Sequence, residues 1–187
     1  MTKKAIVLLA DGFEEVEAVT PIDYLRRAGV EVTIASVSLF MTVKGARRIQ
    51  VNANTELAGV GNGAGEWDAI IIPGGASGAE NIAASEEACA LLKNMAAAGK
   101  LICAICASPA VVLAPLGLLE GKKFTCYPGL EVKVTDGKWS EDRVVIDGNI
   151  ITSRSAGTAG EFAIAIIEKL INKAAAQKIA DAVLLQA

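Results

Sequence analysis

Short apolar runs alternate along the chain with longer segments in which apolar residues recur at helical spacing. The runs have the composition of strands and end at residues that favour turns. Strands of such uniformly apolar character are typical of a sheet buried on both faces. The predicted strands span residues 4–10, 30–37, 69–72, 101–105, 124–126, 144–146 and 150–152.

Helices are predicted between these strands by apolar periodicity and by residues that favour helix ends. Gly29 is placed to end the first helix, Ser85 to cap the second, and Thr158 with Glu161 to form a capping box. A small hairpin is expected at residues 42–52, a surface loop at 59–65, and a tight turn at 147–149. The predicted helices span residues 13–28, 86–99, 109–116, 162–171 and 172–187.

This alternation predicts an α/β fold in which helices cover both faces of a mostly parallel sheet. The length of 187 residues fits one domain over residues 1–187. Ligands of such sheets bind outside the carboxyl ends of the strands. Three features are expected at that edge: the acidic turn after the first strand, the Pro73-Gly74-Gly75 turn, and Cys106.

Composition narrows the classes of function. Aromatic residues make up 4% of the chain, and the net charge is −3, so nothing in it resembles a nucleic-acid-binding surface. The first apolar run is too short for a secretory signal, and acidic residues follow it directly. No apolar run is long enough to span a membrane. We therefore expect a cytoplasmic protein with reduced cysteines and neither nucleic-acid nor membrane partners.

Cys103 and Cys106 form a C-x-x-C pair, which invites a redox or zinc interpretation. Two residues three apart on a strand point to opposite faces, and redox C-x-x-C pairs instead open a helix. The chain contains no histidine, and a zinc site would need one or a second cysteine pair. We expect no metal site.

Cys106 follows a buried strand at the point where a helix is predicted to begin. A nucleophile on such a sharp turn needs small residues two positions away on either side, and Ala104 and Ser108 meet that need. Pro109 suits the first turn of a helix, whose N-terminus would favour a thiolate. The alternative is that Cys106 is an inert cysteine in the core, where this residue type is common.

Glu17 lies in the acidic segment Asp11-Gly-Phe-Glu-Glu-Val-Glu17, among apolar neighbours and four residues before Pro21. Pro21 removes a helical hydrogen bond to the Glu17 carbonyl and should kink the helix. Such surroundings can raise the pKa of a carboxyl and make it a donor to a thiolate. Glu14 and Glu15 are interpreted as ordinary partners of the helix dipole.

Two further groups are weaker candidates for the site. The Gly74-Gly75 pair could offer backbone N–H groups to an oxyanion, although a plain turn explains it equally well. Arg154 and Ser155 follow a predicted strand and could border the same cleft.

Four motifs, LADGFEEVEAVTPID, IIPGGASGAEN, AICASPAVVLA and ITSRSAGT, together resemble the ThiJ/PfpI family over essentially the whole chain. The nearest subgroup is that of the Parkinson-disease-linked protein deglycase and its bacterial relatives. The resemblance implies a flavodoxin-like α/β sandwich, a homodimer and a cysteine site without a cofactor. It also implies glyoxalase and protein-deglycase activity on 2-oxoaldehydes or glycated substrates, with a role in protection against oxidative stress.

By position, the resemblance assigns the nucleophile to Cys106, its acidic partner to Glu17, and the oxyanion donors to the backbone of Gly75 and Ala107. An arginine that reaches the partner subunit's site matches Arg47, or Arg48 beside it. The chain departs from the family pattern in two places. It has Ser108 where members often have glycine, and Tyr127 where many have a histidine before a proline.

The missing histidine argues against a protease or a glutamine amidotransferase, because amide cleavage needs an acid for the departing amine. Two functions stay open. In one, Cys106 adds to the aldehyde of a 2-oxoaldehyde, Glu17 moves a proton between adjacent carbons, and water releases a hydroxy acid. In the other, Cys106 is oxidised to a sulfinate, and the protein acts as a redox sensor or chaperone without turnover.

Overall fold

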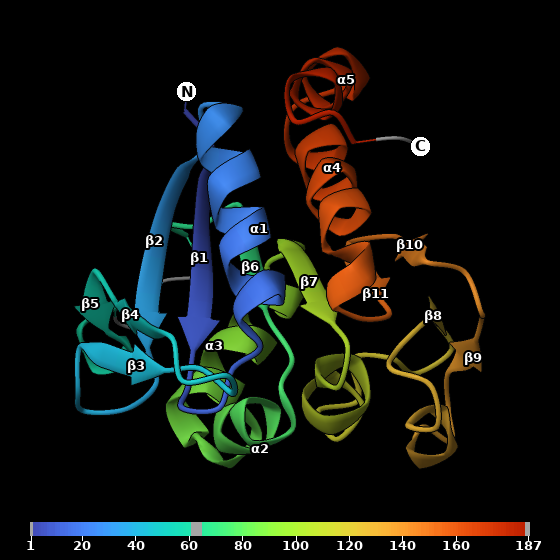
Figure 1. Cartoon of the computed structure of the whole chain (residues 1–187). Coiled ribbons are helices and arrows are strands. Elements are labelled where there is room, and N and C mark those ends of the chain that lie inside the picture. Colours follow the sequence, from blue (N-terminus) through green and yellow to red (C-terminus); the bar gives the residue numbers. More distant parts are fainter. Residues whose placement is uncertain (1, 61–64, 186–187) are drawn as a thin grey trace.

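The computed structural model describes residues 2–60 and 65–185 and has a central seven-stranded sheet in the order β10-β11-β7-β6-β1-β2-β5 (Figure 1). Within this sheet only the pairing of β10 with β11 is antiparallel. The α/β prediction is therefore confirmed. The strands of the sheet are β1 (Lys4–Leu9), β2 (Glu31–Ser36), β5 (Thr55–Glu56), β6 (Ala69–Ile72), β7 (Leu101–Ile105), β10 (Val144–Asp147) and β11 (Ile150–Ser153).

Helices cover both faces of the sheet, as the apolar strands predict. Successive residues of β1 face opposite layers: Val7 packs into the core under α1, α4 and α5, and Leu8 into the core under α2 and α3. The flavodoxin-like sandwich is thus observed. The helices are α1 (Glu15–Arg27), α2 (Ala76–Ala84), α3 (Glu86–Ala97), α4 (Ala159–Leu170) and α5 (Lys173–Ala182).

Short elements connect or flank these layers. The expected hairpin is present as antiparallel β3 and β4, whereas the apolar run at 124–126 contributes to a separate pair, β8 with β9. The expected loop at 59–65 lies partly outside the described residues. The short elements are β3 (Thr42–Lys44), β4 (Gln50–Asn52), η1 (Leu57–Gly59), η2 (Pro109–Leu113), β8 (Lys123–Phe124), η3 (Glu131–Lys133), β9 (Lys138–Trp139) and η4 (Ala156–Thr158).

One helix was not predicted, and another is shorter than predicted. No local pattern indicated α2, whose residue Gly78 allows a close approach to Phe13: a Cβ at Gly78 would lie 2.7 Å from the Phe13 backbone. The helix expected at 109–116 is only the five-residue π-helical η2. The expected helix over 172–187 is α5, capped by Asn172, and residues 186–187 lie outside the described chain.

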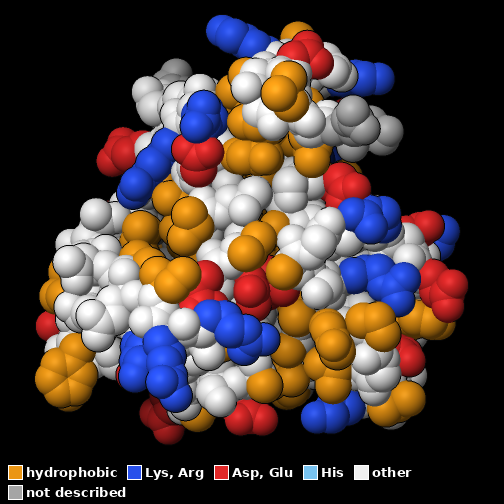
Figure 2. All heavy atoms as spheres, in the orientation of Figure 1, with side chains coloured by type: hydrophobic (Ala, Val, Ile, Leu, Met, Phe, Trp, Pro, Cys, Tyr) orange, Lys and Arg blue, Asp and Glu red, His pale blue; other side chains and the backbone are white. Residues whose placement is uncertain are grey.

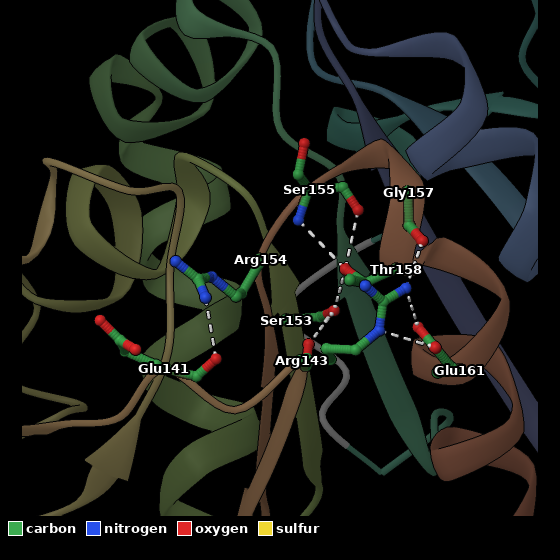
Figure 3. Close-up of polar contacts among 8 residues, drawn as sticks. All are labelled: Glu141, Arg143, Ser153, Arg154, Ser155, Gly157, Thr158 and Glu161. Atoms are coloured by element: carbon green, nitrogen blue, oxygen red, sulfur yellow. Dashed lines mark hydrogen bonds and ion pairs between the residues drawn. The ribbon is translucent and has the colours of Figure 1, made fainter. Parts of the chain in front are cut away.

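The capping box predicted for Thr158 and Glu161 is also wrong. The Thr158 hydroxyl instead accepts from the N–H of Ser155 at 3.1 Å, which makes Ser155 and Thr158 the box around η4. Glu161 pairs with Arg143, whose Nε lies 2.8 Å from a carboxylate oxygen (Figure 3). Glu161 therefore forms a long-range ion pair and not the local capping interaction that the sequence pattern predicts.

The sheet order brings the three predicted site features together. β6 lies between β1 and β7, and the three strands are parallel, so their carboxyl ends lie side by side. The strand order also changes side at β1, because β2 lies on one side of it and β6 on the other, and ligands bind at such a point. The acidic turn leads from β1 into α1, the Pro73 turn from β6 into α2, and Cys106 follows β7.

Candidate active site

Cys106 occupies the turn after β7 in a strained backbone conformation. Its φ is +65°, a value that costs a residue with a side chain about 1–3 kcal/mol. The neighbouring chain holds it from both sides: its N–H donates to the Ser153 carbonyl at 2.9 Å, and its carbonyl accepts from the N–H of Tyr127 at 2.8 Å. The sharp strand-to-helix turn expected for a nucleophile is therefore present.

The small neighbours of Cys106 are needed for packing. Ala104 and Ser108 are both fully buried. The Ser108 hydroxyl donates to the Pro73 carbonyl at 2.6 Å, so a serine here satisfies its polar group and ties the Cys106 turn to the Pro73-Gly74-Gly75 turn.

Glu17 is buried against Cys106. It is 0% exposed, and its Oε2 accepts from the N–H of Gly74 at 2.9 Å. A Cβ on Gly74 would lie 2.5 Å from that oxygen and 2.6 Å from the Cβ of Cys106. Gly74 is therefore a glycine because the carboxyl and the cysteine meet at its position.

Burial dominates the electrostatics of the pair. It raises the pKa of Glu17 to about 7, with the charge of Glu14 adding to the effect. Burial also raises the pKa of Cys106 to about 12, and the nearby charge of Glu17 is the next cause. Since two negative charges in contact are unfavourable, the pair carries a single negative charge between these values.

Backbone N–H groups stabilise a negative charge on either member of the pair, and those of Gly74 and Ala156 lower the pKa of Glu17. Those of Gly75 and Ala107 donate to Cys106 and lower its pKa, against the effect of burial. Gly75 is the N-cap residue that precedes α2 and has a φ of +88°. A Cβ there would collide with the backbone of Gly12, so the position requires glycine. These two donors replace the helix dipole expected after Cys106, because η2 is too short to supply one.

A cleft of about 670 Å³ opens above the pair. Arg47, Tyr127 and Ser155 line it, whereas Gly74, Arg154 and Arg48 do not. Its wall also includes Leu130 and Ala156, which sequence patterns did not single out. The full lining is Gly12, Glu14, Glu17, Ala46, Arg47, Gly75, Ala76, Ser77, Cys106, Ala107, Tyr127, Leu130, Ser155 and Ala156.

Comparison with known proteins agrees with this fold. The model of the DJ-1/PfpI family matches residues 3–169. The chain belongs to the DJ-1/PfpI family. The structure of oxidized Toxoplasma gondii DJ-1 superposes with a TM-score of 0.96 at 44% identity and covers 100% of both chains.

Two curated relatives extend the comparison. The glutathione-independent glyoxalase DJR-1.2 of Caenorhabditis elegans is 39% identical over 171 residues, which are 90% of this chain and 89% of that protein. Protein DJ-1 homolog B of Arabidopsis thaliana is 42% identical over 183 residues, which are 98% of this chain but 41% of that protein. The chain thus spans less than half the length of this plant relative.

Two assignments in this DJ-1/PfpI chain need correction. Gly74 was a candidate oxyanion donor, but its N–H is committed to Glu17. Arg154 does not border the cleft, because its guanidinium donates to the Glu141 carbonyl at 2.9 Å (Figure 3). That Arg47 reaches the partner subunit's site stays a prediction; within its own chain Arg47 lines the cleft.

Glu15 has a different role from the one the sequence suggested. It is 5% exposed, and its Oε1 accepts from the N–H of Arg47 at 2.6 Å, with Ile49 N more distant at 3.4 Å. Glu15 therefore anchors the loop that carries Arg47 to the cleft. Glu14 keeps the expected place at the helix start, where it caps α1 by accepting from the N–H of Glu17 at 2.8 Å.

Two negative findings concern metals and membranes. Within residues 2–60 and 65–185, no group of three or more histidine, cysteine, aspartate or glutamate side chains gathers where it could hold a metal ion. No helix in those ranges has the length and apolar character to cross a bilayer.

We expect limited iodoacetamide to alkylate Cys106 before the other three thiols. Cys103 and Cys126 are fully buried, and Cys89 is only partly exposed, with its Sγ 3.4 Å from the Ala83 carbonyl. Of the four cysteines only Cys106 lines the cleft and has backbone N–H donors for a thiolate. Peptide mapping over time measures the order, and equal rates at Cys89 and Cys106 would contradict this assignment.

Proposed function

We propose that this protein is a cofactor-independent, glutathione-independent glyoxalase of the deglycase type, which acts on reactive 2-oxoaldehydes and on the adducts they form. The observation that carries the proposal is a buried carboxyl with a pKa of about 7 in contact with a cleft cysteine. A group that titrates near neutral pH is suited to both give and take a proton. The Caenorhabditis elegans relative is named for the same chemistry.

The first step is addition of the Cys106 thiolate to the aldehyde carbon, which forms a carbon–sulfur bond and leaves an alkoxide on the former carbonyl oxygen. In this proposal, protonated Glu17 donates a hydrogen bond to the thiolate before this step. The N–H groups of Gly75 and Ala107, which donate to Cys106, would then donate to the new alkoxide. The alkoxide then takes the proton of Glu17, which gives a hemithioacetal and leaves Glu17 as a carboxylate.

Glu17, as a carboxylate, next removes the proton from the hemithioacetal carbon, and a proton is delivered to the neighbouring carbon. The result is a thioester of a 2-hydroxy acid, with no net oxidation of the substrate as a whole. Water then hydrolyses the thioester, which returns the thiol and releases the hydroxy acid. One carboxyl serves both carbons because they are adjacent.

The test is formation of lactate from methylglyoxal by purified protein in the absence of glutathione. We expect turnover with native protein and none after Cys106 has been alkylated with iodoacetamide. Failure of the native protein, with Cys106 unmodified, to form lactate would contradict the proposal. Peptide substrates should not be cleaved, because the chain offers no histidine to protonate a leaving amine.

A redox sensor, with or without chaperone function, is the second candidate. Cys106 is partly exposed in an open cleft, and the same two backbone donors could bind the oxygens of a sulfinate. The similar Toxoplasma gondii DJ-1 structure is of an oxidized protein. Complete retention of lactate formation after peroxide treatment, with Cys106 still a thiol by mass spectrometry, would argue against this candidate.

We further propose a cytoplasmic homodimer in which residues 1–187 act as one domain. Val16 and Val19, three residues apart on α1, are 48% and 47% exposed, and hydrophobic side chains reach the surface on the face seen in Figure 2. A second copy of the chain would cover them. Light scattering should report twice the chain mass, and Val16→Asp with Val19→Asp should shift it to the mass of one chain.

A further inference from the structure

The cleft is much larger than a substrate with a single methyl substituent requires. Its volume of about 670 Å³ lies in the range of roughly 300–1,000 Å³ that is typical of pockets for substantial organic ligands. Exposure increases from Glu17 at the bottom, which is 0% exposed, to Tyr127 at the mouth, which is 49% exposed. Space for a substituent is therefore available between the reacting sulfur and the mouth.

Tyr127 and Leu130 form an apolar wall beside that space. The Tyr127 N–H donates to the carbonyl of Cys106 at 2.8 Å, and the Leu130 N–H donates to the carbonyl of Tyr127 at 3.1 Å. These bonds fix the wall relative to the nucleophile. Among the described residues the Tyr127 hydroxyl has no hydrogen-bond partner, and its half-exposed ring is available to pack against a ligand. Flat rings pack well against other aromatic groups.

Arg47 supplies a cation in the same cleft, and no described residue forms an ion pair with it. Glu14 and Glu17 also line the cleft, and a negative charge on either side chain would oppose binding of an anion near the bottom. A product carboxylate is thus expected to bind toward Arg47, while its substituent lies along the apolar wall.

We propose that the preferred substrates are 2-oxoaldehydes with a bulky apolar substituent, such as an aryl group, and that Tyr127 with Leu130 determines this preference. This inference rests on the proposed glyoxalase function and names the substrate class of the same site. The substituent would stack on the Tyr127 ring while the aldehyde carbon reaches Cys106. Tyr127 acts here as a specificity-determining residue and takes no proton.

The experiment compares kcat/KM for phenylglyoxal and methylglyoxal in wild type, Tyr127→Ala, Tyr127→Phe and Leu130→Ala. We expect Tyr127→Ala to lower the phenylglyoxal-to-methylglyoxal ratio about tenfold, since loss of one apolar contact surface is worth about that much discrimination. Tyr127→Phe should keep the ratio because it keeps the ring. Val132→Ala is the control, since Val132 is exposed and lies outside the cleft.

A binding measurement separates this inference from the proposed function. Mandelate and lactate, the hydroxy acids that correspond to the two aldehydes, are tested for protection of Cys106 against iodoacetamide. We expect mandelate to protect at lower concentration, and Tyr127→Ala to remove that advantage. Loss of the advantage alone, with no turnover of either aldehyde, would support the apolar site and overturn the glyoxalase function. Methylglyoxal turnover with an unchanged ratio in Tyr127→Ala, and equal protection by both acids, would overturn the inference and leave the function standing.

Discussion

Replacing Cys106 with serine should lower the rate of lactate formation from methylglyoxal by on the order of 10³-fold or more, which is the scale for loss of an essential nucleophile. Every step of the proposed reaction passes through a bond to the Cys106 sulfur. A serine hydroxyl is a far weaker acid than a thiol, and one buried carboxyl with a pKa of about 7 cannot ionise it. The rate is measured as lactate released per unit time at saturating substrate.

The matched control for this variant is Cys89→Ser. It makes the same chemical change at a partly exposed thiol that does not line the cleft. We expect its rate to stay within about twofold of wild type, as for surface substitutions away from special features. Comparable rates in Cys106→Ser and wild type would show that the reaction does not use this cysteine.

Replacing Glu17 with glutamine should change how stability depends on pH. Burial raises the pKa of Glu17 from an ordinary 4.5 to about 7 in the folded chain. Between these values the unfolded chain has released the proton and the folded chain still holds it, so the free energy of unfolding falls as pH rises. Above pH 7 the accumulated loss in wild type is about 3 kcal/mol, an upper limit because Cys106 shares the proton. Glutamine cannot ionise, and the variant should lack this fall.

Urea denaturation at a series of pH values from below 4.5 to above 7 measures the effect. Glu87→Gln, at an exposed position of α3, makes the same substitution without burial and should follow the wild-type curve. A Glu17→Gln curve that runs parallel to wild type over the whole range would show that Glu17 is ionised at the same pH in both states. In the activity assay, Glu17→Gln should lower the rate of lactate formation about 10²–10⁴-fold, which is the usual contribution of a general acid–base group to the rate.

Much of the fold could be predicted because its signals are local and repeated. The bounds of β6 and β7 match the expected runs, and continuous apolar strands require cover on both faces. A parallel sheet then brings the ends of neighbouring strands to one edge. The sheet order therefore predicts that Glu17, Gly75 and Cys106 lie near one another.

The reason why Glu17 is buried could not be predicted correctly from the sequence. The carboxyl of Glu17 is buried as expected, but its sequence neighbours Val16 and Val19 are both about half exposed. Burial comes instead from Gly74 and Cys106, which lie far along the chain and meet Glu17 only through the sheet order. A helical neighbour pattern cannot report such a contact, so the prediction was right for a partly wrong reason.

Side chains with several possible partners were also hard to assign. Glu161 and Arg154 were given local or cleft roles, yet each binds a group more than ten residues away, as Figure 3 shows. Glu15 was interpreted as a dipole partner because its backbone lies in the first turn of a helix. Its carboxylate instead satisfies the N–H of Arg47, which only the folded hairpin brings close.

The central claim is that the single negative charge of the buried pair lies on the Cys106 sulfur while Glu17 holds the proton. Ultraviolet thiolate absorbance, measured against pH in wild type, Glu17→Gln and Glu17→Leu, tests it, with Cys106→Ser subtracted to remove the other thiols. The proposed reaction needs a thiolate near neutral pH, so we predict a wild-type thiolate midpoint far below the value of about 12 to which burial raises the pKa of Cys106. Glu17→Gln, which keeps a donor, should stay close to that midpoint, and Glu17→Leu should lie about one to two pH units higher. A wild-type thiolate that appears only toward pH 12, with Glu17→Leu at the same or a lower midpoint, would place the charge on Glu17 and contradict the account.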